Sequence, residues 1–380
     1  MKRWLIVLVI VALATTFLNA YAAQVDVGNG WVKINTEGET VCADGSPYNF
    51  WAHEGTSDDL LIFFQGGGAC WNDAMCADGG GISYVETIGE SLEYPMAAPG
   101  VFDFANPENP FKDYNVVSIP YCTGDIHMGS QDVEYTGRDG AVTIHHQGFT
   151  NASAALDWVY ENYTAPEDVF VSGCSAGGYG AIFHAPRVIE QYGDTAATIT
   201  HLSDASIGVL PDESYFDGFN VWGIGENIPD WLPMQEALQS NFNPVDYYTA
   251  VAQQYPEHTF GEYTTAYDNV QVLFYHLQKL ADWSAGIGTL LIERGKAEEV
   301  SEAGWSAGMN ERLDTINAAV ENFSTFIAGG TEHCILDRDF MYTYEADETR
   351  FVDWLAELAK GEPVADVACS ACEEAELAAQ

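Results

Sequence analysis

Residues 168–180 read DVFVSGCSAGGYG and decide the fold of this chain. The strand-like run 168–172 is followed by Ser175, which has Gly173 two residues before it and Gly177 two residues after it. A strand that turns sharply into a helix needs glycine there, because a Cβ atom would clash with neighbouring backbone. The turn lifts the serine hydroxyl outward, and the N-terminus of the following helix favours developing negative charge. The stretch therefore predicts a nucleophilic serine after a buried strand.

The segments around this turn alternate between strand-like and helix-like patterns. Such a succession is typical of parallel strands joined by crossover helices. We therefore predict an α/β-hydrolase-like fold, with a mostly parallel central sheet and helices on both faces. Residues 211–257 are rich in Trp, Tyr and Pro and predict an irregular or helical, lid-like insertion over the sheet edge. Strands are expected at 60–68, 114–122, 168–172, 196–206, 259–265 and 322–330, and helices at 145–163, 177–192, 269–280 and 351–360.

A serine nucleophile needs a base, and the base needs an orienting acid; this fold supplies them in the order Ser, Asp, His. His333 stands in GGTEHC after the last expected strand, which makes it the predicted base. Asp268, in AYDN after the preceding strand, is the predicted acid. Asp204 in HLSDAS follows an earlier strand and stays open as the alternative acid.

An acyl-transfer site also needs hydrogen-bond donors for the oxyanion. The early strand runs into FFQGGGACW, where hydrolases carry a glycine-rich oxyanion loop. We predict that the backbone N–H groups of Gly67, Gly68 and Ala176 form this hole. A phosphate-binding loop is disfavoured because no Gly-Lys-Ser/Thr follows.

Three further histidines compete for a role. His127 lies on a loop after a strand and is expected to line the pocket. His145 and His146 are expected to start a helix ahead of the serine, so chain order disfavours them as the base. Adjacent residues at a helix start point in different directions, which predicts a solvated or capping role rather than a metal site.

Several motifs together resemble the pectin acetylesterase and Notum family of carboxylesterases, and most of all its bacterial members. The likeness runs from about Gly55 to Phe340, with the motifs in family order. It implies an α/β-hydrolase-type fold and a serine carboxylesterase that needs no cofactor and no metal. The motifs are FFQGGGACW, NPFKDYNVVSIPYCTGDIHMGS, HHQGFTNASAALDWV, GCSAGGYGA and TTAYDNVQ.

The resemblance also implies roles for individual residues. Ser175, Asp268 and His333 correspond to nucleophile, acid and base, and the oxyanion donors are those already named. Asp125 and His127, in YCTGDIHMG, are similar to a loop that borders the pocket, in a supporting or substrate-facing role. We expect Trp71 to contact substrate as well.

The N-terminus has the pattern of a secretory signal peptide. Lys2 and Arg3 precede an apolar run, and AYA at 20–22 suits cleavage after Ala22. An uncleaved anchor is the alternative, although the run is short for a membrane span. We therefore predict a signal peptide at 1–22, an esterase domain at 23–362 and an acidic, flexible tail at 363–380, in a secreted or periplasmic protein.

The chain has eight cysteines, which predict disulfides in an exported protein. Cys70 and Cys76 are the best local pair, and a Cys42–Cys122 bridge is a further possibility. The CSAC motif at 369–372 is expected either to close on itself or to bridge to Cys174 or Cys334.

The charge balance limits the possible partners. Fifty-seven Asp and Glu residues stand against thirteen Lys and Arg, a formal net charge of −44. Such a surface disfavours nucleic acid and anionic membranes, and it keeps copies of the chain apart as monomers. The acidity fits either a saline habitat or an ordinary acidic exoprotein.

The sequence therefore predicts a secreted serine esterase that removes acetyl or other short acyl groups, with an acylated polysaccharide as the leading substrate. Short-chain esters or polyesters are the alternative within this class. A non-catalytic carbohydrate-binding protein on the same scaffold, or a protease, are alternatives from other classes.

Overall fold

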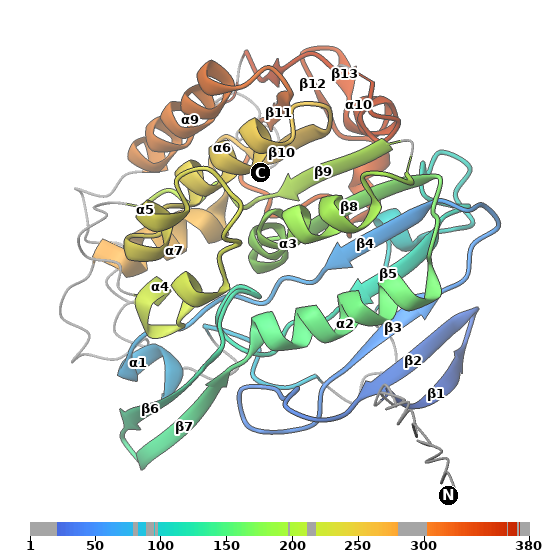
Figure 1. Cartoon of the computed structure of the whole chain (residues 1–380). Helices are drawn as coiled ribbons and strands as arrows, with labels where there is room; N and C mark the ends of the chain where they lie inside the picture. Colours follow the sequence, from blue (N-terminus) through green and yellow to red (C-terminus); the bar gives the residue numbers. More distant parts are fainter. Residues whose placement is uncertain are drawn as a thin grey trace, which may run out of the picture.

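The structure is a computed structural model of the whole chain, shown in Figure 1. It describes residues 21–78, 83–88, 95, 98–196, 198–210, 218–279, 302–362, 364–370 and 372. The predicted signal peptide at 1–22 lies outside this part except for Tyr21 and Ala22. Residues 211–217 of the expected insertion and 373–380 of the expected tail lie outside it as well.

A ten-stranded sheet forms the centre of the molecule, in the order β1-β2-β3-β5-β4-β8-β9-β10-β11-β14. From β5 to β14 every neighbouring pair is parallel, whereas β1, β2 and β3 pair antiparallel. The predicted mostly parallel α/β sheet is therefore confirmed. Its strands are β1 (Tyr21–Gly28), β2 (Trp31–Thr36), β3 (Asn49–His53), β4 (Leu60–Phe64), β5 (Asn115–Ile119), β8 (Asp168–Cys174), β9 (Thr198–Asp204), β10 (Thr259–Thr265), β11 (Phe323–Ala328) and β14 (Val367–Ala368).

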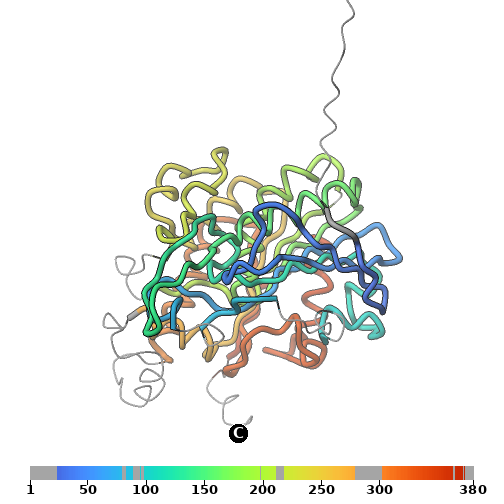
Figure 2. Tube along the Cα trace, turned by 90° about the horizontal axis from the view of Figure 1, so that it is seen from below, coloured from blue at the N-terminus to red at the C-terminus, as the bar shows by residue number. Residues whose placement is uncertain are grey.

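Helices cover both faces of this sheet, as Figure 2 shows edge-on, with the green and yellow segments above it and the red segment below. The main α-helices are α2 (Gly148–Asn162), α3 (Ala176–Tyr192), α6 (Pro244–Gln254), α7 (Asn269–Lys279), α9 (Glu302–Ala319) and α10 (Phe351–Leu358). Shorter helical segments are α1 (Asp73–Cys76), η1 (Gly100–Phe102) and η4 (Asp339–Tyr342).

Alternation along the strands builds a separate core on each face. In β4, Ile62 and Phe64 join the core under α2, α3 and α6, whereas Leu61 and Phe63 join the core under α10. Both cores are needed because successive side chains of a strand point to opposite faces. This explains why LLIFF is apolar at every position. The sheet is thus fixed on both sides, and its strand ends make a rigid base for loops.

The described part of the 211–257 segment is helical, as expected. It contains α4 (Gly218–Val221), η2 (Ile224–Asn227), α5 (Gln235–Ser240) and α6. Phe219 and Trp222 of this segment are buried and reach the cavity described below. The insertion therefore covers the carboxyl ends of the parallel strands.

Two expectations for local structure were wrong. His145 and His146 do not start a helix but end strand β7 (Gly140–His146), which forms a hairpin with β6 (Gln131–Gly137). The segment after Gly361 is not simply a loose tail, because β14 pairs in parallel with β11 and buries Val367. A second small hairpin joins β12 (Glu345–Ala346) to β13 (Thr349–Arg350).

All eight cysteines form disulfides, namely Cys42–Cys122, Cys70–Cys76, Cys174–Cys334 and Cys369–Cys372. The two pairs favoured by the sequence are confirmed, and the CSAC motif closes on itself. Among the helices described, none combines the length and the apolar character that a membrane crossing requires.

Candidate active site

Ser175 stands at the turn between β8 and α3, in a backbone conformation that few residues adopt. Its φ of 58° and ψ of −123° fall where a non-glycine residue carries strain of about 1–3 kcal/mol. The Ser175 N–H donates to the Asp204 carbonyl at 2.7 Å, which ties the turn to the neighbouring strand β9. Ser175 is half-buried between buried neighbours, so its side chain is presented to a cavity rather than to the core.

The glycines of the motif are explained by close backbone contacts. A Cβ on Gly177 would lie 1.9 Å from the Phe64 carbonyl oxygen, and one on Gly173 would lie 2.4 Å from the Gly177 oxygen. A Cβ on Gly66 would lie 3.0 Å from the Ser175 Cβ. The glycine loop after β4 is therefore packed directly against the serine turn.

The expected oxyanion donors lie on these two adjoining segments. Gly68 faces Tyr84 in an isolated antiparallel bridge, held by bonds from the Ala69 N–H and to the Gly67 carbonyl. In such a pair the Gly68 N–H points away from the partner segment. Within the described chain, the N–H groups of Gly67, Gly68 and Ala176 have no hydrogen-bond acceptor. An oxyanion hole requires donors of this kind, with no acceptor of their own.

His333 and Asp268 are brought together, as the sequence predicted for the base and its acid. His333 Nδ1 lies 2.9 Å and 2.8 Å from the two carboxylate oxygens of Asp268. An ionised carboxylate only accepts, so Nδ1 carries the proton and Nε2 has a free lone pair. Nε2 is buried and has no hydrogen-bond partner in the described chain, Ser175 included. The hydrogen bond between a catalytic base and its nucleophile is often long or absent until substrate binds.

Asp268 is fully buried and held by a helix start. Its Oδ1 accepts the backbone N–H groups of Val270 at 3.0 Å and Gln271 at 2.9 Å, at the N-terminus of α7. The Gln271 side-chain amide donates to Oδ2 at 3.1 Å. The sequence analysis did not identify Gln271, although its place three residues after an aspartate at a helix start is the signal for such a cap.

Asp204, the alternative acid, makes no hydrogen bond to His333. Its Oδ2 accepts the N–H groups of Ile335 at 2.9 Å and Leu336 at 2.8 Å, in the loop that carries His333. Its Oδ1 is buried and has no hydrogen-bond partner among the residues that the structure describes, and burial raises the pKa of this carboxyl to about 7. The geometry therefore favours Asp268 over Asp204 as the acid.

A cavity of about 80 Å³ is lined by Ser175, His333 and mostly apolar groups. Trp71 is among its lining residues, as expected of a substrate contact. The cavity lies at the carboxyl ends of the parallel strands, where ligands bind in open α/β sheets. Its aromatic lining comes from Trp71, Tyr179, Phe219, Trp222, Phe274 and Trp305.

Asp125 and His127, expected in a supporting or substrate-facing role, are buried and do not line the cavity, which favours the supporting role over a direct contact with substrate. Asp125 accepts from the Thr123 hydroxyl at 2.6 Å and the Gly148 N–H at 2.7 Å. His127 Nε2 donates to the Gln65 carbonyl at 2.9 Å, one residue before the glycine loop. Two consecutive positive φ values, at Ile126 and His127, turn the side chains inward. His127 therefore supports the chain that leads into the glycine loop, whereas Asp125 ties its own loop to the start of α2.

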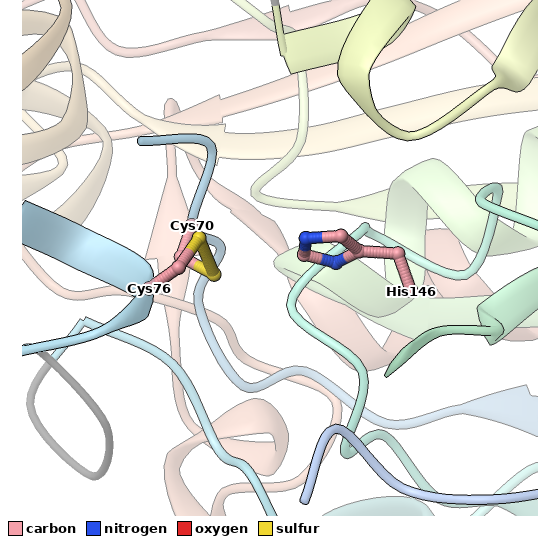
Figure 3. Close-up of side chains that lie close together, drawn as sticks. All are labelled: Cys70, Cys76 and His146. Atoms are coloured by element: carbon pink, nitrogen blue, oxygen red, sulfur yellow. A yellow bond between two sulfur atoms is a disulfide. The ribbon is translucent and has the colours of Figure 1, made fainter. Parts of the chain in front are cut away.

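Figure 3 shows a cluster with metal-like spacing, formed by Cys70, Cys76 and His146. The two sulfurs are joined in a disulfide and are not thiolates. The ring of His146 is also occupied, because Nδ1 donates to the Thr123 carbonyl and Nε2 accepts the Tyr135 hydroxyl. The expected solvated or capping role of His146 is wrong, and this cluster is a structural support near the glycine loop. His145 is half-buried and pairs with Asp132.

Comparison with known proteins gives a consistent result. Residues 20–351 match a family model described as "Pectinacetylesterase". Pectin acetylesterase 5 of Arabidopsis thaliana is 27% identical over 53% of this chain and 43% of its own length. Human palmitoleoyl-protein carboxylesterase NOTUM is 28% identical over 42% of this chain and 31% of its own length. The chain thus matches less than half the length of these relatives.

Among solved structures, the Wnt deacylase Notum from Drosophila superposes with a TM-score of 0.63 at 14% identity. The superposition covers 92% of this chain and 96% of that one. At this identity the likeness shows the fold alone, and it confirms the α/β-hydrolase-like arrangement.

Proposed function

This chain belongs to the pectinacetylesterase family, and we propose that it is a serine carboxylesterase whose nucleophile is Ser175. The observation that carries the proposal is the shared cavity, in which Ser175 lies beside a histidine already paired with a buried aspartate. Neither a metal nor a cofactor is required, because nucleophile, base and acid all come from the chain.

In the proposed reaction, the Ser175 hydroxyl oxygen attacks the ester carbonyl carbon while His333 Nε2 takes the hydroxyl proton. Asp268 accepts the Nδ1–H throughout, which fixes the reactive tautomer and stabilises the imidazolium. The tetrahedral intermediate expels the alcohol, which receives the proton from His333. Water then attacks the acyl carbon while His333 takes a proton from it. The bond between the acyl carbon and the Ser175 oxygen breaks, that oxygen receives the proton from His333, and the carboxylic acid leaves.

Stabilisation of the oxyanion would come from the N–H groups of Gly67, Gly68 and Ala176. These donors belong to two segments packed against each other, so they are fixed before the reaction begins. Donors that need no reorganisation lower the barrier most, and a single one is worth about 3–4 kcal/mol.

The acyl group of the substrate would enter the cavity, because its lining is mostly apolar and aromatic. A sugar with many hydroxyls is poorly suited to such a lining, so the alcohol part would remain outside. We propose short acyl esters of a polysaccharide as the substrate class, with simple short-chain esters as the alternative. Support for the polysaccharide comes from the family and from Arabidopsis pectin acetylesterase 5.

Export with removal of residues 1–22, and a monomeric state, complete the proposal. Four disulfides support an oxidising compartment. Cleavage after Ala22 would take only Tyr21 and Ala22 from strand β1 and leave its pairing with β2 from Gln24 onward. The strongly acidic surface supports a monomer that binds neither nucleic acid nor anionic membranes.

The test is acetate release from acetylated pectin, acetylated xylan and p-nitrophenyl acetate at low and high salt. Ser175→Ala should lower kcat by roughly 10⁴-fold or more, because the nucleophile and its base act as a unit. The melting temperature of the variant should match that of the wild type. A variant that hydrolyses these esters at the wild-type rate would refute the role of Ser175. Wild-type protein that binds acetylated pectin without releasing acetate would favour a carbohydrate-binding protein instead.

A further inference from the structure

A second, smaller cavity lies behind the one that holds Ser175. It has a volume of about 10 Å³, against about 80 Å³ for the outer cavity. Tyr179 and Pro244 line both. Residues that line two neighbouring cavities separate them, so Tyr179 and Pro244 form the wall between the outer and the inner cavity.

Tyr179 is well placed to be the decisive part of this wall. It lies on α3 four residues after Ser175, and its N–H donates to the Ser175 carbonyl at 3.3 Å, so both side chains share one face of the helix start. Like Ser175, it is half-buried while residues 176–178 between them are buried. The aromatic side chain therefore stands beside the nucleophile in the same cavity.

The ring of Tyr179 is also held firmly in place. A Cβ on Gly208 would come within 3.2 Å of the Tyr179 Cε1 and within 3.1 Å of the Pro244 side chain. Gly208 has a φ of +66°, so the chain passes close to the ring with a residue that has no side chain. A ring packed this tightly between α3, Gly208 and Pro244 has little room to move aside for a ligand.

The inner cavity, behind the ring of Tyr179, is too small to hold part of an acyl chain. A cavity of about 10 Å³ is at the lower limit for a single water molecule. Its lining is largely apolar and includes Ile182, Ile207 and Phe242. An acyl chain that passed the position of the ring would thus enter an apolar environment, but the ring closes the way.

We infer that Tyr179 sets the upper limit of acyl chain length by closing the inner end of the acyl cavity. The inference rests on the proposed esterase function and adds to it a specificity-determining residue and a substrate class. The wild-type enzyme accepts acetyl to about butyryl esters, and longer straight chains meet the phenol ring.

The experiment compares kcat/KM for p-nitrophenyl acetate, butyrate and hexanoate. In the wild type, kcat/KM should fall about 10-fold or more from butyrate to hexanoate, since each methylene that does not fit costs a factor of this order. Tyr179→Ala removes the ring and joins the two cavities, so the hexanoate-to-acetate ratio of kcat/KM should rise about 10-fold or more. Tyr179→Phe keeps the ring and should keep the wild-type ratio within about 3-fold.

Two further variants serve as a control and as a second test of the ring. Ile182→Ala enlarges only the inner cavity and leaves the wall intact, so it should not change the ratio. Tyr179→Leu replaces the ring with a smaller apolar side chain, and it should raise the ratio even if the alanine variant does not fold. The inference is overturned if folded Tyr179→Ala or Tyr179→Leu keeps the wild-type ratio, or if Ile182→Ala raises the ratio equally. A wild type that hydrolyses none of the esters would instead refute the proposed function.

Discussion

Strands β9 and β10 are neighbours in the sheet, and each has a fully buried aspartate at or just after its carboxyl end, yet the two aspartates do different things. Asp268, after β10, contacts a histidine that can exchange a proton. The side chain of Asp204, at the end of β9, accepts hydrogen bonds from two backbone N–H groups and from no other group in the described part of the chain. The difference shows that a buried carboxylate after a parallel strand has no inherent role. The loop that returns over the strand end assigns it.

Both aspartates act on the loop after β11, from two sides. Asp268 orients the ring of His333, whereas Asp204 holds the backbone of Ile335 and Leu336. The Asp204 carbonyl also accepts the Ser175 N–H, so this residue links the serine turn to the histidine loop. We interpret Asp268 as part of the chemistry and Asp204 as part of the frame that holds it.

The largest expected effect is on kcat, and it distinguishes the acid Asp268 from the supporting Asp204. Asp268→Asn should lower kcat by roughly 10³–10⁴-fold. The amide nitrogen of asparagine donates a hydrogen bond, so the side chain no longer requires the proton of His333 to stay on Nδ1. Asp204→Asn should lower kcat by no more than about 3-fold, because its amide oxygen still accepts both N–H groups.

The measurement is kcat for p-nitrophenyl acetate at pH 8, with the melting temperature of each variant as the check on folding. If Asp204→Asn lost more activity than Asp268→Asn, the assignments of acid and frame would have to be exchanged.

The second prediction concerns the disulfide that joins the same two segments. Cys174 precedes Ser175 and Cys334 follows His333, and the bridge closes 160 residues of chain. Replacing both with alanine should destabilise the fold by about 5 kcal/mol in the chain-entropy view, and should lower the melting temperature by roughly 10 °C. Replacing Cys369 and Cys372, only three residues apart, should cost about 2 kcal/mol.

Calorimetry on the two double variants, with kcat measured well below the melting transition, tests this. Equal losses of stability would show that the long bridge adds nothing beyond a local link. Full activity without Cys174–Cys334 would show that Asp204 alone suffices to hold the histidine loop.

Much of the arrangement followed from the sequence, because glycine requirements and chain order are local properties. The GCSAGG turn and the strands before and after it carry strong local patterns, and Asp268 and His333 follow their strands in the expected order. The choice between Asp204 and Asp268 was different. Both follow β-strands, and only the path of the returning loop decides which one meets the histidine.

Other features lacked any local signal. The inward orientation of His127 depends on two consecutive positive φ values in a loop, which residue types did not indicate. The first four residues of β7 are exposed, so its alternation was too weak to separate it from the helix that follows at Gly148. Strand β14 has two residues, and it forms by adding to the sheet edge rather than through its own pattern.

Asp204→Asn has the smallest expected effect on activity, but it should change how the stability of the protein depends on pH. Burial raises the pKa of this carboxyl to about 7 in the folded protein, against about 3.9 in an unfolded chain. Between these values the folded state holds a proton that the unfolded state has lost. Wild-type stability therefore falls as pH rises from about 4 to about 7 and levels off above, by at most about 4 kcal/mol.

Asp204→Asn removes this contribution, since an amide does not titrate. The melting temperature of the variant minus that of the wild type should lie near zero at pH 4 and reach about 5 °C or more at pH 8. The slope that buried Asp125 adds is common to both proteins and cancels in the difference. The Glu262 slope does not cancel fully, because the Asp204 charge helps to raise the Glu262 pKa and is absent from the variant. Asp230→Asn, at an exposed position, is the control for the loss of one carboxylate on the surface. A flat difference for Asp204→Asn would mean that this carboxylate stays ionised in the fold, and that the comparison between the two aspartates rests on geometry alone.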